Sequence, residues 1–73
     1  MDKKDKDILK LSKLLKHWAD HNNNHKESFL KWQIIARNYG LNQIVENLGK
    51  AIEFMDKCSE YLISAHNELE RNF

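Results

Sequence analysis

The sequence predicts an all-α protein, an antiparallel two-helix hairpin that dimerises into a four-helix bundle. Apolar residues recur at alternating steps of three and four over two long stretches, which is the spacing of helices that pack along one side. The chain has no proline, and Gly40, one of its two glycines, falls between the two stretches. With 73 residues the chain is close to the lower limit for a stable core, so we expect a disulfide, a metal or an oligomer to stabilise it.

The first helix is predicted over residues 5–39. Its predicted buried stripe consists of Ile8, Leu11, Leu15, Trp18, Asn22, His25, Phe29, Trp32, Ala36 and Tyr39, with Leu14, His21, Ser28 and Ile35 beside it. Asp20 and residues 22–24 are poor helix formers, so a three-helix monomer broken near 20–25 is the alternative. We favour a continuous helix, because the three-four spacing crosses this segment without losing its phase.

A turn at residues 40–41 and a second helix over 42–72 follow. Gly40 can take the left-handed conformation that ends a helix, and Asn42 can cap the next one. The second buried stripe consists of Val45, Leu48, Ile52, Met55, Ser59, Leu62, His66, Leu69 and Phe73, and it is widened by Ile44, Ala51, Cys58 and Ala65. A short turn makes the helices antiparallel neighbours. The expected register sets Phe29 level with Ile52.

The apolar stripe is wider than a single helix–helix contact can cover. The residues beside it are Leu9, Leu14, Ile34, Ile35, Ile44 and Ile63. We therefore expect a second hairpin to cover this surface, which makes the protein a homodimer. A different protein docking on the same helical face is the alternative.

Charge and composition exclude other partners. The 12 basic and 11 acidic residues are interleaved and give a net charge of +1, whereas nucleic-acid binders cluster their basic residues. No apolar run reaches the roughly 18 residues of a membrane span. We expect no nucleic-acid partner and no membrane partner. The single cysteine, Cys58, and the lack of a signal peptide predict a cytoplasmic protein.

Polar residues gather halfway along the predicted hairpin and suggest a metal site. His17, His21 and His25 are four residues apart, so successive side chains drift only about 40° around the helix. Neighbouring histidines at this spacing can share one metal ion, and zinc, nickel and cobalt all accept imidazole nitrogen. Further ligands could come from Asp56, Glu53, Glu60 or Cys58, which fall at about the same level on the second helix, or from the partner hairpin. The predicted metal ligands are therefore His17, His21, His25, Asp56 and Cys58, in a small carrier, buffer or sensor of a divalent transition metal.

The alternative is a non-catalytic interaction module. In it the polar residues halfway along the hairpin, which we call the polar belt, only fix the register in which the helices pair. Asn22 and Ser59 bonded to each other would do so, as buried asparagines do in coiled coils. We expect no enzyme and no catalytic residue. Cys58 has no recognisable oxyanion site, and the Glu-x-x-His motifs of di-iron bundles are missing.

The stretch from His17 to His25, which reads H-W-A-D-H-N-N-N-H, is followed by Phe29 and by Gly40-Leu41. It resembles uncharacterised small prokaryotic helical-hairpin proteins that carry an H-W-x-x-H-N-x-x-H pattern on their first helix. The resemblance implies that His17, His21, Asn22 and His25 are the residues to test, and it implies no activity.

Overall fold

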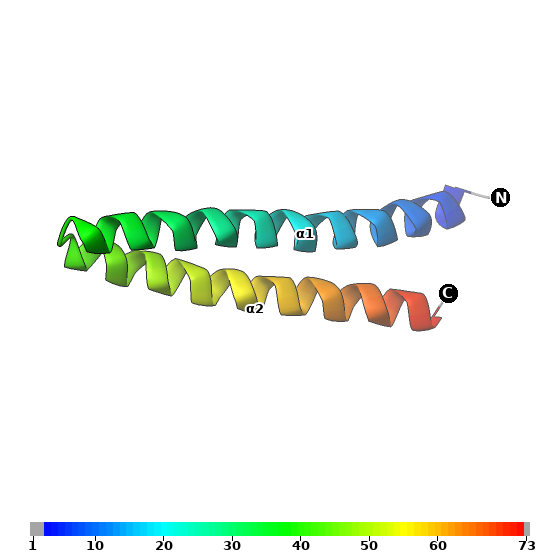
Figure 1. The fold of residues 1–73 in the computed structure, drawn as a ribbon. Helices are drawn as coiled ribbons and strands as arrows, with labels where there is room; N and C mark the ends of the chain where they lie inside the picture. The colour runs from blue at the N-terminus through cyan, green and yellow to red at the C-terminus, as the bar shows by residue number, and fades with distance from the viewer. Residues whose placement is uncertain (1–2, 73) are drawn as a thin grey trace.

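The computed structural model describes residues 3–72, and the side chains of residues 6–72. It contains two helices, α1 (Lys3–Asn38) and α2 (Asn42–Asn72), which lie side by side and antiparallel (Figure 1). The predicted all-α hairpin is confirmed. Because α1 runs without a break through residues 20–25, the three-helix alternative is wrong. Phe73, predicted as the last residue of the second stripe, lies outside the described residues.

The turn has the hydrogen bonds that the glycine predicts. Gly40 has a φ of 72°, in the left-handed region. Its N–H donates to the carbonyl of Arg37 at 3.0 Å, and the N–H of Leu41 donates to the carbonyl of Ala36 at 3.0 Å. These two bonds form a Schellman motif, which satisfies the free carbonyls at the end of α1. At the start of α2 the N–H of Val45 donates to the carbonyl of Leu41 at 3.0 Å. The N-cap position is therefore that of Leu41, one residue before the predicted cap, Asn42.

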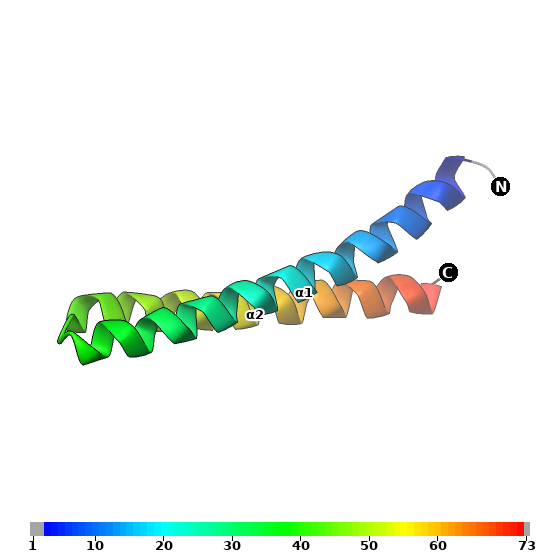
Figure 2. The same cartoon turned by 45° about the horizontal axis from the view of Figure 1, so that its top comes forward.

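The hairpin is a rod with little interior. It measures 57 × 15 × 12 Å, and its radius of gyration is 16.8 Å. A compact domain of this length would have a radius of gyration of about 11 Å. The two helices wind about each other, and the first turns of α1 lean away from α2 (Figure 2). A single helix–helix contact line therefore holds the chain.

On α2 the buried stripe is the predicted one, as far as the described residues extend. On α1 the predicted stripe is only half right. Its alternate members are buried or half-buried: Ile8, Leu15, Asn22, Phe29 and Ala36. The others are exposed: Leu11, Trp18, His25, Trp32 and Tyr39. The residues that follow four of these occupy the contact line in their place: Ser12, Ala19, Lys26 and Gln33.

The size of the side chains explains this correction. The most buried residues are small or aliphatic: Ala19 at 3% exposure, Ala36 at 6%, Ser59 at 7% and Leu15 at 8%. Small side chains let two helix backbones approach closely, and an indole ring does not fit between them. Trp18 and Trp32 therefore stay 42% and 57% exposed. Hydrophobicity alone selects the tryptophans for the core, whereas steric fit selects their smaller neighbours.

Polar side chains cross between the helices and agree with the predicted register to within one residue. Ser12 Oγ donates to Glu70 Oε1 at 2.6 Å, and Asn22 Nδ2 donates to Cys58 Sγ at 3.1 Å.

Near the turn, the side chain of Gln33 crosses to the backbone of α2. Its Nε2 donates to the carbonyl of Val45 at 3.0 Å. A Cβ on Gly49 would lie 3.2 Å from the same nitrogen. Because Gly49 has no side chain, the Gln33 amide can pack against the backbone of α2 at this point. The contact ties α1 to the first turn of α2.

Neither of the two helices, over residues 3–72, has a segment long and apolar enough to cross a membrane.

Candidate metal site

Two imidazole rings meet on the outer side of α1. The Nε2 atoms of His21 and His25 lie 2.9 Å apart, with ring centroids 4.4 Å apart and an angle of 84° between the rings. The spacing of four residues on a continuous helix produces this contact. At this distance the two nitrogens can form a hydrogen bond, and the tautomers of the rings decide which nitrogen donates.

This arrangement is close to that of two nitrogens on one metal ion. Zinc–nitrogen bonds of about 2.0–2.1 Å at tetrahedral angles place two ligand nitrogens about 3.3 Å apart. The observed separation of 2.9 Å is a few tenths of an ångström shorter. Binding one metal ion between the two nitrogens therefore requires only a small opening of the His21–His25 pair.

The rings on either side extend the pair along the helix. His17 stacks on His21 with centroids 6.0 Å apart and planes 27° apart. On the other side, the ring of Phe29 lies 6.1 Å from that of His25. The rings of His17, His21 and His25, which we call the histidine ladder, therefore follow one another along the exposed side of α1. The direct nitrogen–nitrogen contact in it is that between His21 and His25.

The two candidate ligands from α2 are placed differently. The Asp56 carboxylate lies 2.6 Å from Lys26 Nζ, in an ion pair across the contact line. Cys58 Sγ accepts the hydrogen bond from Asn22, which sequence reasoning had paired with Ser59. Within the part of the chain that the structure describes, no three metal-ligating side chains come together. One hairpin thus groups two ligands, His21 and His25.

Sequence reasoning missed the role of Lys26. The predicted contact line included His25, and no role was assigned to Lys26. The structure places Lys26 on that line, half-buried, and His25 outside it. A lysine level with an acidic residue of the facing helix was the signal that could have identified this ion pair.

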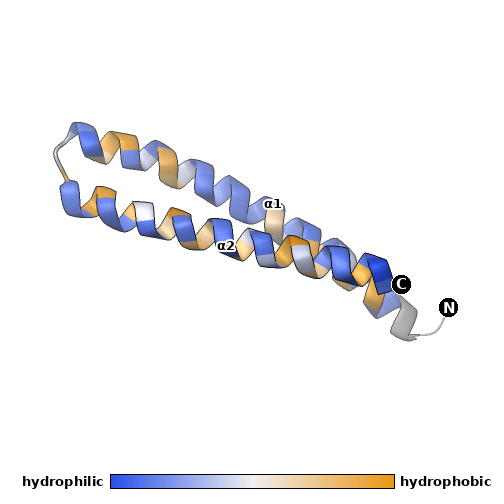
Figure 3. Cartoon of the chain, turned by 90° about the horizontal axis from the view of Figure 1, so that it is seen from below, coloured by the Kyte–Doolittle hydropathy of each residue, from blue (hydrophilic) through white to orange (hydrophobic). Residues whose placement is uncertain are grey.

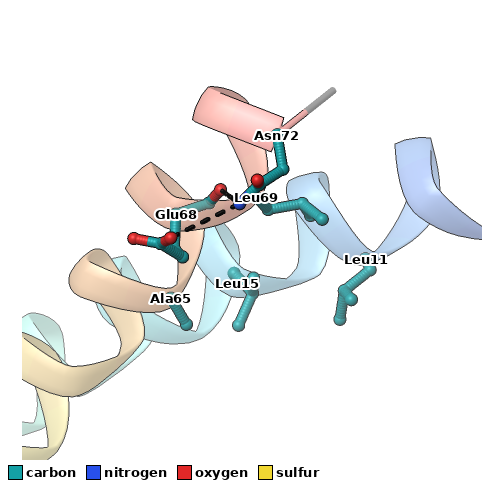
Figure 4. Close-up of a pocket in the computed structure, with 6 residues that line it drawn as sticks. All are labelled: Leu11, Leu15, Ala65, Glu68, Leu69 and Asn72. Carbon is teal, nitrogen blue, oxygen red and sulfur yellow. Dashed lines mark hydrogen bonds between the residues drawn. The ribbon is translucent and has the colours of Figure 1, made fainter.

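The outward positions of the two helices form two unlike faces. We call the first the aromatic face. On α1 it contains Leu11, Leu14, Trp18, His21, His25, Ser28, Trp32, Ile35 and Tyr39, and on α2 it contains Ile44, Asn47, Ala51, Phe54, Cys58, Tyr61 and Ala65. The residues of each row are seven apart, so each row follows one side of its helix. Leu11 and Ala65 line the same groove, together with Leu15, Glu68, Leu69 and Asn72 (Figure 4). The rows of α1 and α2 that contain Leu11 and Ala65 therefore lie on one side of the hairpin.

The opposite side is the charged face. Lys16 and Ile63 line a shared hollow there, and the Lys26–Asp56 ion pair lies on the same side. Its rows carry Lys13, Lys16, Asp20, Glu27, Arg37, Glu46, Glu53, Asp56, Glu60 and Glu70. The residues that define the aromatic face include no Lys, Arg, Asp or Glu, but Glu68, seven residues after Tyr61, lines the groove at the open end of this face. Hydrophobic bands recur along both helices and are interrupted by a hydrophilic stretch in the middle of α1 (Figure 3).

Comparisons with other proteins give a family and no activity. A search among curated proteins and a search among solved structures each gave no match. A family model described as a domain of unknown function matches residues 11–69, which include the histidine ladder and Cys58. The match covers well over half of the chain, and the chain therefore belongs to this family, DUF8180.

Proposed function

We propose that this protein is a small metal-binding helical protein, a carrier, buffer or sensor, that takes zinc, nickel or cobalt at the His21–His25 pair. The observation that supports the proposal is the contact of 2.9 Å between the two Nε2 atoms. Two unlinked histidines would have to lose side-chain freedom before they could share an ion. Here the helix has already brought both nitrogens to one point, which lowers that entropy cost.

The exposure of the pair suits a protein that exchanges its metal. Both His21 and His25 are exposed, so an ion reaches them directly from solvent. Two protein ligands leave open positions on a four-coordinate metal, which water or further ligands fill. The single free thiol of Cys58 fits a reducing compartment, and we place the protein in the cytoplasm as part of this proposal.

The test is a titration with zinc, nickel and cobalt of protein that carries no histidine tag. The wild type is compared with the double variant His21→Ala/His25→Ala. The matched control is His66→Gln, which removes a histidine that lies beside Glu70 and away from the pair. We expect the wild type and the control to bind with a dissociation constant below about 10 μM, and the double variant to bind far more weakly. Equal binding by the double variant, or no binding by the wild type, contradicts the proposal.

A second candidate is a non-catalytic interaction module, in which the polar belt only sets the pairing register. The aromatic face favours it, because Phe54, Tyr61 and Tyr39 are each more than 70% exposed. Monomeric proteins rarely expose large contiguous apolar patches, and exposed rings on one face are typical of a surface that a partner covers. If no metal binds in the titration, this second function is the one supported.

A further inference from the structure

We infer that a second copy of this chain covers the aromatic face, and that the metal site is completed between the two copies by two His21–His25 pairs. This inference rests on the proposed function and adds the source of the remaining ligands. It also identifies which side of the hairpin forms the dimer.

The hairpin exposes more surface than a compact monomer of its mass. The accessible surface of the chain is 5953 Å². A folded monomer of 8.7 kDa exposes about 4,700 Å². The excess of about 1,200 Å² is larger than the roughly 800 Å² that each partner buries in a standard interface. Leu15, Ala19 and Ala36 are the buried hydrophobic residues of the described chain, so the hairpin alone has almost no core.

The chemistry of the two faces selects the side that is covered. The aromatic face carries large exposed rings along its length. Trp18, Phe54 and Tyr61 lie near the level of the two histidines, and Trp32 and Tyr39 lie toward the turn. Covering this face buries few formal charges, since its defining residues include no Lys, Arg, Asp or Glu and the Glu68 carboxylate lies at its open end. Covering the charged face would desolvate carboxylates and ammonium groups, at a cost that apolar contacts there would not offset.

The pattern along the aromatic face fits a second copy better than an unrelated protein. The face is mainly apolar toward each end, and its polar side chains His21, His25 and Cys58 lie together in the middle, among exposed rings. Two copies can bury the same face by a two-fold axis along the rod, which keeps every residue at its own level. They can also use a two-fold axis perpendicular to the rod, which makes the two hairpins antiparallel. The apolar ends then face apolar ends only when this axis passes through the middle of the rod. Both arrangements bring the two polar middles together.

What meets there is a complete ligand set. One hairpin offers two imidazole nitrogens and, over its described residues, no third clustered ligand. Two hairpins offer four imidazoles, the number of ligands that tetrahedral zinc takes in closed sites. A metal there also replaces the polar contact that two facing histidine pairs would otherwise lack within a buried interface.

The main test uses the wild-type protein and thermodynamic linkage. If the ion binds two copies at once, it must tighten their association by the same factor by which association tightens metal binding. The dimer dissociation constant is measured by sedimentation, in zinc and in a chelator. We expect zinc to lower it by about tenfold or more. The double variant His21→Ala/His25→Ala should show the same dimer dissociation constant in both buffers.

A matched pair of variants tests which face is covered. Trp32 and Ile34 are 57% and 55% exposed, and two residues correspond to a rotation of about 200° around the helix. Trp32→Glu places a charge on the aromatic face, and Ile34→Glu places one on the charged face. We expect a mass near 8.7 kDa for Trp32→Glu and near twice that for Ile34→Glu. The wild-type measurement stands even if Trp32→Glu does not fold.

The outcomes separate this inference from the proposed function. If zinc binds but leaves the dimer dissociation constant unchanged, the shared site is wrong and the proposed function stands. If no metal binds, both the shared site and the proposed function are wrong. In that case the comparison of Trp32→Glu with Ile34→Glu still decides which face pairs. A wild-type chain that stays at 8.7 kDa in zinc at high concentration overturns the inference.

Discussion

Lys26 Nζ lies 2.6 Å from Asp56 Oδ1, so a cross-helix ion pair stands near the level of the two histidines but on the other side of the contact line. The Asp56 carboxylate, which was predicted from the sequence to bind a metal, pairs instead with the ammonium group of Lys26. Asp56 and the His21–His25 pair lie near the same level along the rod, but on opposite faces of the hairpin.

We expect Asp56→Asn to leave zinc affinity unchanged, since the carboxylate belongs to the ion pair with Lys26. The side chains of Lys26 and Asp56 are 34% and 48% exposed, so solvent screens the pair. Its loss should lower the free energy of unfolding by no more than about 1 kcal/mol. Zinc titration and urea unfolding measure the two effects. A marked drop in zinc affinity would instead place Asp56 in the metal site.

Zinc should raise the thermal stability of the wild type, because folded protein holds the two imidazoles together and the unfolded chain does not. Free zinc at a hundred times its dissociation constant adds about 2.7 kcal/mol by mass action. Acidification should weaken this effect, since protons compete with the metal for imidazole nitrogen. Melting curves with and without zinc over a pH series measure it. A zinc effect that grows on acidification would point to ligands other than histidine.

The middle of α1 should be its least protected part. Asp20 and residues 22–24 have low helix propensity, and the structure holds them in helix through a polar stretch of the contact line. Amide exchange should be faster there than around Leu11 or Phe29. Zinc should slow exchange at residues 20–25 before it affects the ends. Uniform protection in metal-free protein would contradict this.

A larger side chain at Ala19 should force the helices apart. Ala19 is 3% exposed on the contact line, so Ala19→Leu should lower the free energy of unfolding by about 1–3 kcal/mol. Asn24→Leu is the control, because Asn24 is exposed and a leucine there meets solvent. Urea unfolding compares the two variants. If both are equally stable, Ala19 is not at the close approach.

The sequence predicted the features of the fold that depend on spacing. Gly40 marked the turn, and the apolar steps gave the two helices and their register. The contact line of α1 could not be assigned in full. Either Leu11 and Trp18 or their neighbours Ser12 and Ala19 could lie on the contact line. Both choices keep the seven-residue spacing and share Ile8, Leu15, Asn22, Phe29 and Ala36. The choice between them depends on how close two backbones come, which hydrophobic periodicity does not encode.

The same ambiguity limited the prediction of the site. His21 and His25 meet because of their spacing on a single helix, so the sequence alone could predict their contact. Which residues of α2 join them depends on the side of the hairpin, and therefore on the rotation of α1. A rotation by one residue moved Lys26 onto the contact line and gave it Asp56 as a partner.

The amide of Gln33 that reaches the carbonyl of Val45 has a consequence for how the chain folds. These residues are 12 apart, whereas Ser12 and Glu70 at the open end are 58 apart. Closing a short loop loses less chain entropy than closing a long one. We therefore expect the contacts between the helices to form first near Gly40 and then outward along the hairpin. The Gln33 hydrogen bond should be among the first to form and the Ser12 hydrogen bond among the last. Contacts of such short sequence separation are typical of chains that fold in microseconds to milliseconds.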